Sequence, residues 1–239
     1  MRRWSGRPKI VGVSKSLEVR PARARHKDGP TRVYLEVGAK RTFASAADWP
    51  GWCRAGKDEK AALDALAAYA PRYAPVAKAA GVLFPTHATA FKVVERLKGN
   101  ATTDFGAPGI PANEESRRLS AEAAKRMCDL VAAGWSHLDK VVAKAPAALR
   151  KGPRGGGRDR DPMFIHVLGA EVGYARQIGT RLKELEVAEK VAVRAHREAI
   201  LESLASPNRV EKWPVPYAAR RIAWHALDHA WEIEDRSKP

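Results

Sequence analysis

Two histidines four residues apart, His225 and His229, lie in the C-terminal stretch "WHALDHAWEIEDR". Side chains at positions i and i+4 of a helix point from the same face, so two such imidazoles can bind one metal ion. The alternative is a pair of buried histidines that only make hydrogen bonds, and the spacing alone does not separate the two. A third imidazole from another segment would favour the metal.

His166 is the candidate for that third imidazole. It belongs to an apolar stripe at helical spacing, which comprises Met163, His166, Val167, Ala170 and Tyr174. The C-terminal histidines belong to a similar stripe, which comprises Ala218, Ile222, His225, His229 and Ile233. All three imidazoles are therefore expected to face the protein interior.

Burying three imidazoles without partners is costly, because each ring has a donor and an acceptor to satisfy. A single metal ion bound by His166, His225 and His229 satisfies all three rings at once. Three neutral imidazoles suit Zn²⁺, and also Ni²⁺ or Fe²⁺, and they leave a coordination position open for water or a substrate. The sequence therefore predicts a divalent-metal site of the catalytic kind, with no catalytic side chain assigned.

Other residues fit this site less well. Asp228 or Glu171 would orient a ligand only if turned inward, and the pattern favours surface positions for both. Four further histidines lie in the tail, in a loop, or among charged and small residues: His26, His87, His137 and His196.

Four amphipathic helices are expected after residue 118, over 120–146, 161–185, 186–206 and 215–237. Ser120 is a suitable N-cap for the first, and Asp161 for the second, where Pro162 would take the first helical position. Helices of such lengths with modest loops predict a four-helix bundle.

The first half of the chain has the patterns of strands and turns rather than of long amphipathic helices. Residues 31–46 predict a β-hairpin around "GAK", and 91–97 predict a third strand. Between them, a turn-rich stretch precedes a helix that is capped by Asp58 and interrupted by Pro71. Residues 98–118 are expected to be loop, and "KIVGV" in the tail a short strand or extended chain. The expected fold class is α+β, with a basic tail over 1–30, a small module and connector over 31–117, and a helical bundle over 118–239.

The C-terminal half resembles the DinB-like bundle family over about residues 118–236. The resemblance is carried by a histidine near the start of one helix and by the His-x-x-x-His pair in "RRIAWHALDHAWEIEDR". This family includes thiol-dependent S-transferases and mycothiol-dependent maleylpyruvate isomerases. The resemblance implies an up-down four-helix bundle whose metal ligands are His166, His225 and His229. It also implies a small-molecule thiol of the mycothiol type that attacks an electrophile, while hydrolysis at the same site stays open.

Residues 31–75 resemble the HicB-like antitoxin module. The features that carry this resemblance are a hairpin, the turn "WPGW" at 49–52, then Gly56, Lys57 and Asp58, and an Ala/Leu-rich helix. The resemblance implies a small β-sheet with one helix, similar in outline to RNA-binding folds. An antitoxin role would require a toxin partner, about which the sequence says nothing.

The charge distribution supports an alternative function. The net charge is +16, and residues 1–41 contribute +9 from 12 Lys and Arg against 3 acids, while 150–160 contribute +4. Such segments can bind RNA or a ribosome, with Trp4 available to stack on a base, although a basic tail is also often merely solvated. The candidate nucleic-acid contacts are Arg2, Arg3, Trp4, Arg7, Lys9, Arg20, Arg23, Arg25, Arg150, Lys151, Arg154, Arg158 and Arg160.

Composition excludes several other classes. The longest apolar stretches fall short of a membrane span, and two isolated cysteines in 239 residues fit a reducing cytoplasm better than a disulfide framework. Cys53 is expected to be a packed thiol. The glycine-rich "GPRGGGRDR" lacks the Gly-Lys-Ser/Thr ending of a phosphate-binding P-loop. A homodimer is left open.

Overall fold

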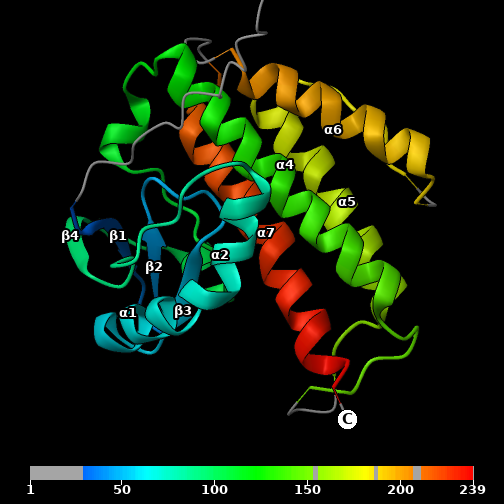
Figure 1. Ribbon diagram of the computed structural model, residues 1–239, viewed down its shortest axis with the longest axis horizontal. Helices are drawn as coiled ribbons and strands as arrows, with labels where there is room; N and C mark the ends of the chain where they lie inside the picture. The colour runs from blue at the N-terminus through cyan, green and yellow to red at the C-terminus, as the bar shows by residue number, and fades with distance from the viewer. Residues whose placement is uncertain (1–28, 153–155, 186–187, 207–210, 239) are drawn as a thin grey trace, which may run out of the picture.

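The computed structural model describes residues 29–152, 156–185, 188–206 and 211–238. The described chain has an α+β fold, in which a four-stranded sheet comes first and is followed by the longest helices, as expected. Figure 1 shows the sheet with α1 and α2 on one side of the molecule, α5 and α6 on the other, and α7 between them. The "KIVGV" segment lies outside the described residues.

The sheet has the strand order β3-β2-β1-β4. Strands β1 (Thr31–Val37) and β2 (Thr42–Ala46) form the predicted antiparallel hairpin, and β4 (Phe91–Lys98), the predicted third strand, pairs parallel to β1. Strand β3 (Cys53–Gly56) was not expected, because this stretch was interpreted as turn. Its four residues are too few to show alternation, and it is held by pairing with β2 and by close approach of Gly56 to α1.

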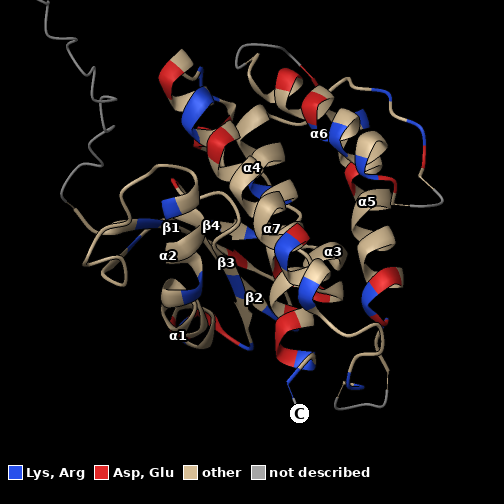
Figure 2. Ribbon diagram, turned by 45° about the vertical axis from the view of Figure 1, so that its right-hand side comes forward, with Lys and Arg blue, Asp and Glu red and all other residues tan. Residues whose placement is uncertain are grey.

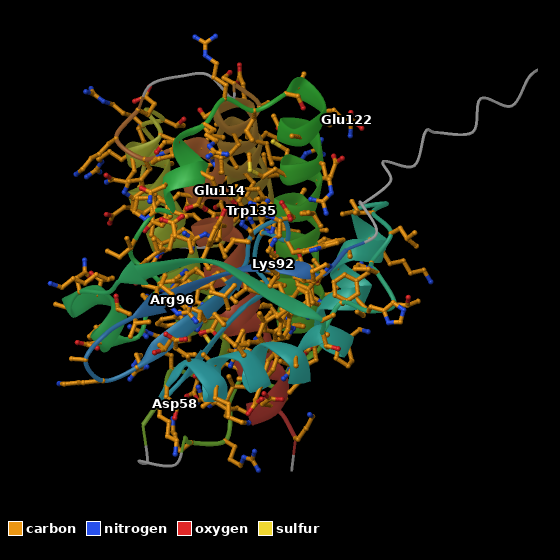
Figure 3. All side chains as sticks on the ribbon, turned by 90° about the vertical axis from the view of Figure 1, so that its left-hand side faces the viewer. Asp58, Lys92, Arg96, Glu114, Glu122 and Trp135 are labelled. Carbon is orange, nitrogen blue, oxygen red and sulfur yellow. The ribbon has the colours of Figure 1, made fainter. Side chains whose placement is uncertain are left out.

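One edge of the sheet faces solvent. Lys92 and Arg96 are exposed on β4, where Figure 3 labels them. Charged side chains on an edge strand hinder pairing with the strands of other chains. The edge is therefore protected against unwanted strand addition.

Two short helices cover the sheet. Asp58 caps α1 (Glu59–Ala68) as predicted, and its carboxylate accepts a hydrogen bond from the Ala61 amide at 2.8 Å. Helix α1 is followed directly by α2 (Ala70–Ala79), and Tyr69 separates the two. Pro71 lies in the first turn of α2, where a missing N–H costs little. The prediction that residues 98–118 form a loop is wrong in part. It contains α3 (Ala101–Phe105), which Asn100 caps, and the 3₁₀ turn η1 (Asn113–Ser116).

Four longer helices pack around a shared apolar core, namely α4 (Ala121–Lys144), α5 (Arg160–Gln177), α6 (Lys190–Leu204) and α7 (Val215–Arg236). Ser120 caps α4 as predicted. The expected start of α5 after Asp161 is wrong. This helix begins at Arg160, because the Met163 amide donates to the Asp159 carbonyl at 2.9 Å, which makes Asp159 the N-cap residue. The Asp159 carboxylate instead accepts the Leu149 amide. Helix α5 also ends at Gln177 rather than near residue 185, with Gly179 at a φ of +77°.

Helix α7 belongs to both halves of the protein. Its Ile222 and Ala226 pack in the core formed with α4, α5 and α6, whereas Leu227 and Trp231 pack with Trp52 and the sheet layer. Helix α7 therefore lies between two apolar clusters and contributes buried side chains to both. In Figure 2, long stretches of α4 and α5 are tan and lie between turns that carry charged residues.

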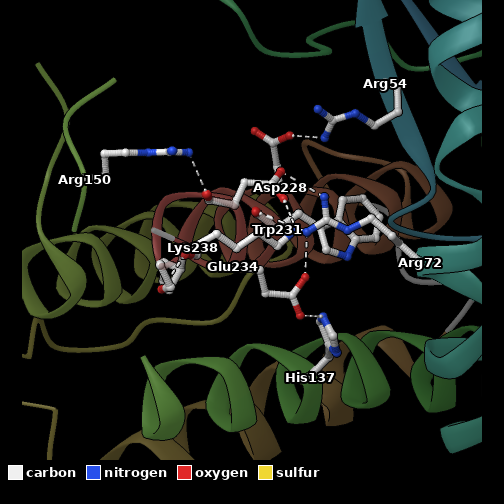
Figure 4. A network of polar contacts seen from close by, with 11 residues as sticks. Arg54, Arg72, His137, Arg150, Asp228, Trp231, Glu234 and Lys238 are labelled. Carbon is white, nitrogen blue, oxygen red and sulfur yellow. Dashed lines mark hydrogen bonds and ion pairs between the residues drawn. The ribbon is translucent and has the colours of Figure 1, made fainter. Parts of the chain in front are cut away.

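Ion pairs join α7 to the layers on either side (Figure 4). Arg54 of β3 contacts Asp228 at 2.6 Å, and Arg72 of α2 contacts Glu234 at 2.6 Å. Glu234 also faces the His137 imidazole of α4 at 3.2 Å. The polar contact with His137, and next that with Arg72, holds the pKa of the Glu234 carboxyl well below its usual range. Among the described helices, none is long and apolar enough to cross a membrane.

Candidate metal centre

The three predicted histidines converge at one place. Their ring centroids lie 5.1 Å apart for His166 and His225, 5.1 Å for His166 and His229, and 4.7 Å for His225 and His229. One nitrogen from each ring lies within 4.8 Å of the other two. The prediction that imidazoles of two helices meet is therefore confirmed, and it follows from the i, i+4 spacing on α7 and the packing of α5 against it.

The residues fit a divalent metal. Tetrahedral ligation with metal–nitrogen bonds of about 2.0–2.1 Å places ligand nitrogens about 3.4 Å apart, which small ring rotations reach from the observed spacing. His225 is only 8% exposed, and its Nδ1 atom is buried without a hydrogen-bond partner in the described structure. A buried nitrogen without a partner is costly, and a metal would relieve that cost. In the described part of the chain, no other group of His, Cys, Asp and Glu has this arrangement.

The environment favours the neutral imidazoles that a metal requires. Burial is the main cause that lowers the pKa of His166, and it holds the pKa of His225 well below its usual range. The charge of Arg158 adds to this for His166, and for His225 the added cause is the repulsion that a second protonated ring in the cluster would meet. At neutral pH both rings are therefore unprotonated and can donate a lone pair.

An acid that the sequence interpretation missed orients His229. Its Nδ1 atom lies 3.1 Å from a carboxylate oxygen of Glu232, one turn further along α7. The His-x-x-Glu spacing was visible in the sequence and could have indicated this contact. The two acids considered before lie elsewhere. Asp228 pairs with Arg54, and Glu171, expected at the surface, is 3% exposed and contacts Arg197.

Aromatic side chains and one guanidinium surround the cluster. The rings of Tyr174 and Trp224 lie 5.7 and 5.9 Å from that of His225. Arg221, one turn before His225, is 9% exposed and donates to the Pro108 carbonyl at 2.8 Å. Its guanidinium lies 4.9 Å from the Trp224 ring centroid. The site therefore combines aromatic side chains beside the buried His225 with a fixed positive charge.

The predicted nucleic-acid contacts are only partly placed. Among the described ones, Arg150 donates to the Asp235 carbonyl at 3.1 Å, Lys151 pairs with Asp159 at 3.3 Å, and Arg160 with Asp161 at 2.6 Å. Arg158 is exposed, and its charge acts on His166. Of the described residues of the basic loop, Arg158 thus lies near the histidine cluster. Nine candidates lie outside the described residues: Arg2, Arg3, Trp4, Arg7, Lys9, Arg20, Arg23, Arg25 and Arg154.

The two cysteines are packed thiols. Cys53 is fully buried, and burial raises the pKa of its thiol to about 12. Burial also raises the pKa of the Cys128 thiol, to about 11. Neither is poised as a nucleophile at neutral pH, which confirms the expectation for Cys53.

No protein-family model matches this sequence, and neither a curated protein nor a solved structure is significantly similar to it.

Proposed function

We propose that this chain is a DinB-like, divalent-metal-dependent thiol S-transferase whose helices α4 to α7 form an up-down bundle around a three-histidine centre. The convergence of His166, His225 and His229 carries the proposal. The thiol would be of the mycothiol type and the second substrate a small electrophile. Zinc is the preferred metal, with nickel or iron as alternatives.

A divalent metal, when bound, supplies the positive charge that stabilises a thiolate near neutral pH. The chain's own residues prepare the site for it. Burial keeps His166 and His225 neutral, and Glu232 accepts from Nδ1 of His229, which leaves Nε2 of that ring to face the cluster. His225 is only 8% exposed and packs beside the rings of Tyr174 and Trp224, so charges near it are poorly screened.

Elemental analysis of the purified protein tests the proposal. We expect about one equivalent of zinc, nickel or iron per chain. The His225→Ala variant should lose the metal and keep its circular dichroism spectrum, whereas His196→Ala, on α6 outside the cluster, should keep both. A wild-type protein without a stoichiometric transition metal would contradict the metal centre. Metal-dependent consumption of an electrophile by a low-molecular-weight thiol then tests the transferase step.

The charge on residues 1–41 favours a second candidate, a protein that binds RNA or a ribosome. The HicB-like resemblance supports it, because the hairpin is followed by the 49–52 turn, the Asp58 cap and helix α1, as in the motif. Retention on RNA that weakens steeply with salt, together with no metal-dependent thiol chemistry, would favour this candidate.

A further inference from the structure

We propose that Glu232 and Arg236 position the His229 imidazole, and that the glycine-rich loop fixes the outer end of this hydrogen-bonded series. The loop is represented by its described flanks, 149–152 and 156–159. This inference rests on the proposed metal centre and assigns the residues that set its affinity.

The inner half of the series runs along one face of α7. Nδ1 of His229 lies 3.1 Å from Oε2 of Glu232, and Oε1 of the same carboxylate accepts from Arg236 at 2.9 Å. Each carboxylate oxygen thus has its own partner, so the carboxylate cannot rotate without breaking one contact. Donation from Nδ1 leaves Nε2 of His229 as the nitrogen that faces His166 and His225.

The outer half joins Arg236 to the loop. Nε of Arg236 donates to the Arg150 carbonyl at 2.7 Å, and the Arg150 amide donates to the Arg236 carbonyl at 3.0 Å. Gly157, at a φ of +112°, lies against the guanidinium, and a Cβ atom at this position would come within 2.8 Å of NH1. Only glycine therefore combines this backbone conformation with so close an approach.

A comparable pair elsewhere lacks these features. Arg194 and Glu198 on α6 form an i, i+4 ion pair at 2.7 Å, but their side chains are 79% and 60% exposed. The Arg236 side chain is only 9% exposed, and that of Glu232 36%. Exposed pairs of this kind contribute little, whereas a guanidinium held from two sides can fix the carboxylate that it contacts. The α6 pair is thus a matched control.

The zinc affinity of the full chain, measured by competition with a chromophoric chelator, tests the role of this hydrogen-bonded series. We expect Glu232→Ala to weaken zinc binding about 10-fold or more. Gly157→Ala should weaken it in the same direction, although residue 157 contacts no histidine. Arg236→Lys, which keeps the charge but loses the planar fork, should fall between them and wild type. Glu198→Ala should match wild type.

Nitrogen NMR of the metal-free protein gives a second readout, independent of zinc. His229 should carry its proton on Nδ1 in wild type, and this preference should be lost in Glu232→Ala and reduced in Arg236→Lys. Unchanged zinc affinity and an unchanged His229 tautomer in these variants would overturn the positioning role of the series while leaving the metal centre intact. Absence of zinc binding in wild type would instead overturn the metal centre, and with it the positioning role of the series.

Discussion

At the scale of single residues, Glu171 shows how burial dominates electrostatics in this protein. This residue of α5 is 3% exposed, and its carboxylate makes only a long contact with Arg197 of α6, at 3.5 Å. Arg197 gives its shorter contacts, at 2.8 and 2.9 Å, to Asp139. Burial therefore outweighs the attraction and raises the pKa of Glu171 to about 7.

This pKa predicts a pH-dependent stability. A carboxyl whose folded pKa lies above its unfolded value favours folding most below about pH 4.3, and this contribution is lost as the pH rises through about 7. Glu171→Gln cannot ionise, so it should be more stable than wild type by roughly 1–3 kcal/mol at pH 8. The advantage should shrink to about 1 kcal/mol at pH 5 and disappear only below about pH 4.3. Urea unfolding at both pH values measures it, with the exposed Glu198→Gln as control. An equal effect at both pH values would contradict the account.

At the scale of elements, a buried ion pair attaches η1 to α7. Arg220 and Glu115 have side chains only 3% and 4% exposed, and they meet at 2.8 and 2.9 Å. Arg220 also donates to the Ile110 carbonyl at 3.1 Å. One guanidinium thus holds the connector that follows α3 against the central helix.

Removing one partner of this pair should be costly. Glu115→Gln leaves the Arg220 charge buried and poorly compensated, so we expect a loss of about 3–5 kcal/mol in the free energy of unfolding. The matched control is Glu59→Gln, which removes an exposed pair with Arg96 and should cost less than about 1 kcal/mol. Denaturant melts of the two variants compare them. Similar small losses for both would mean that the connector does not depend on the buried pair.

At the scale of the whole molecule, α7 is the element on which both halves depend. Trp224 packs on Phe43 and Cys53 of the sheet, while Ile233 on the same helix packs in the core of the long helices. Sixteen of its residues are buried, more than an amphipathic helix on the surface of a bundle would bury. The sheet and the long helices therefore bury their apolar clusters against the same helix.

A helix that is buried by two clusters at once predicts cooperative unfolding. In a fragment of residues 118–239, Trp224, Leu227 and Trp231 would lose the sheet-side partners that now bury them. We expect this fragment to lack a cooperative thermal transition, and the full chain to unfold in one step by both far-ultraviolet circular dichroism and tryptophan fluorescence. Two separated transitions in the full chain, or a stable fragment, would show that the halves are independent.

The sequence by itself determined what depends on neighbours within one or two turns. The caps at Asp58 and Ser120, the 31–46 hairpin and the inward direction of His225 and His229 follow from local hydrogen bonding and periodicity. These features depend on residues at most a few positions apart, so a sequence pattern records them directly.

Only the tertiary structure decided which distant segments meet. The short β3 strand, the burial of Glu171 and the contact of Arg236 with the 150–157 loop depend on partners far along the chain. The pattern indicated that His166 points inward, and the cost of burying three imidazoles led to the prediction that it meets His225 and His229, but the periodicity itself gave no distance between the rings. Side-chain direction is set locally, whereas distance is set by how α5 packs on α7, and this packing depends on the whole core.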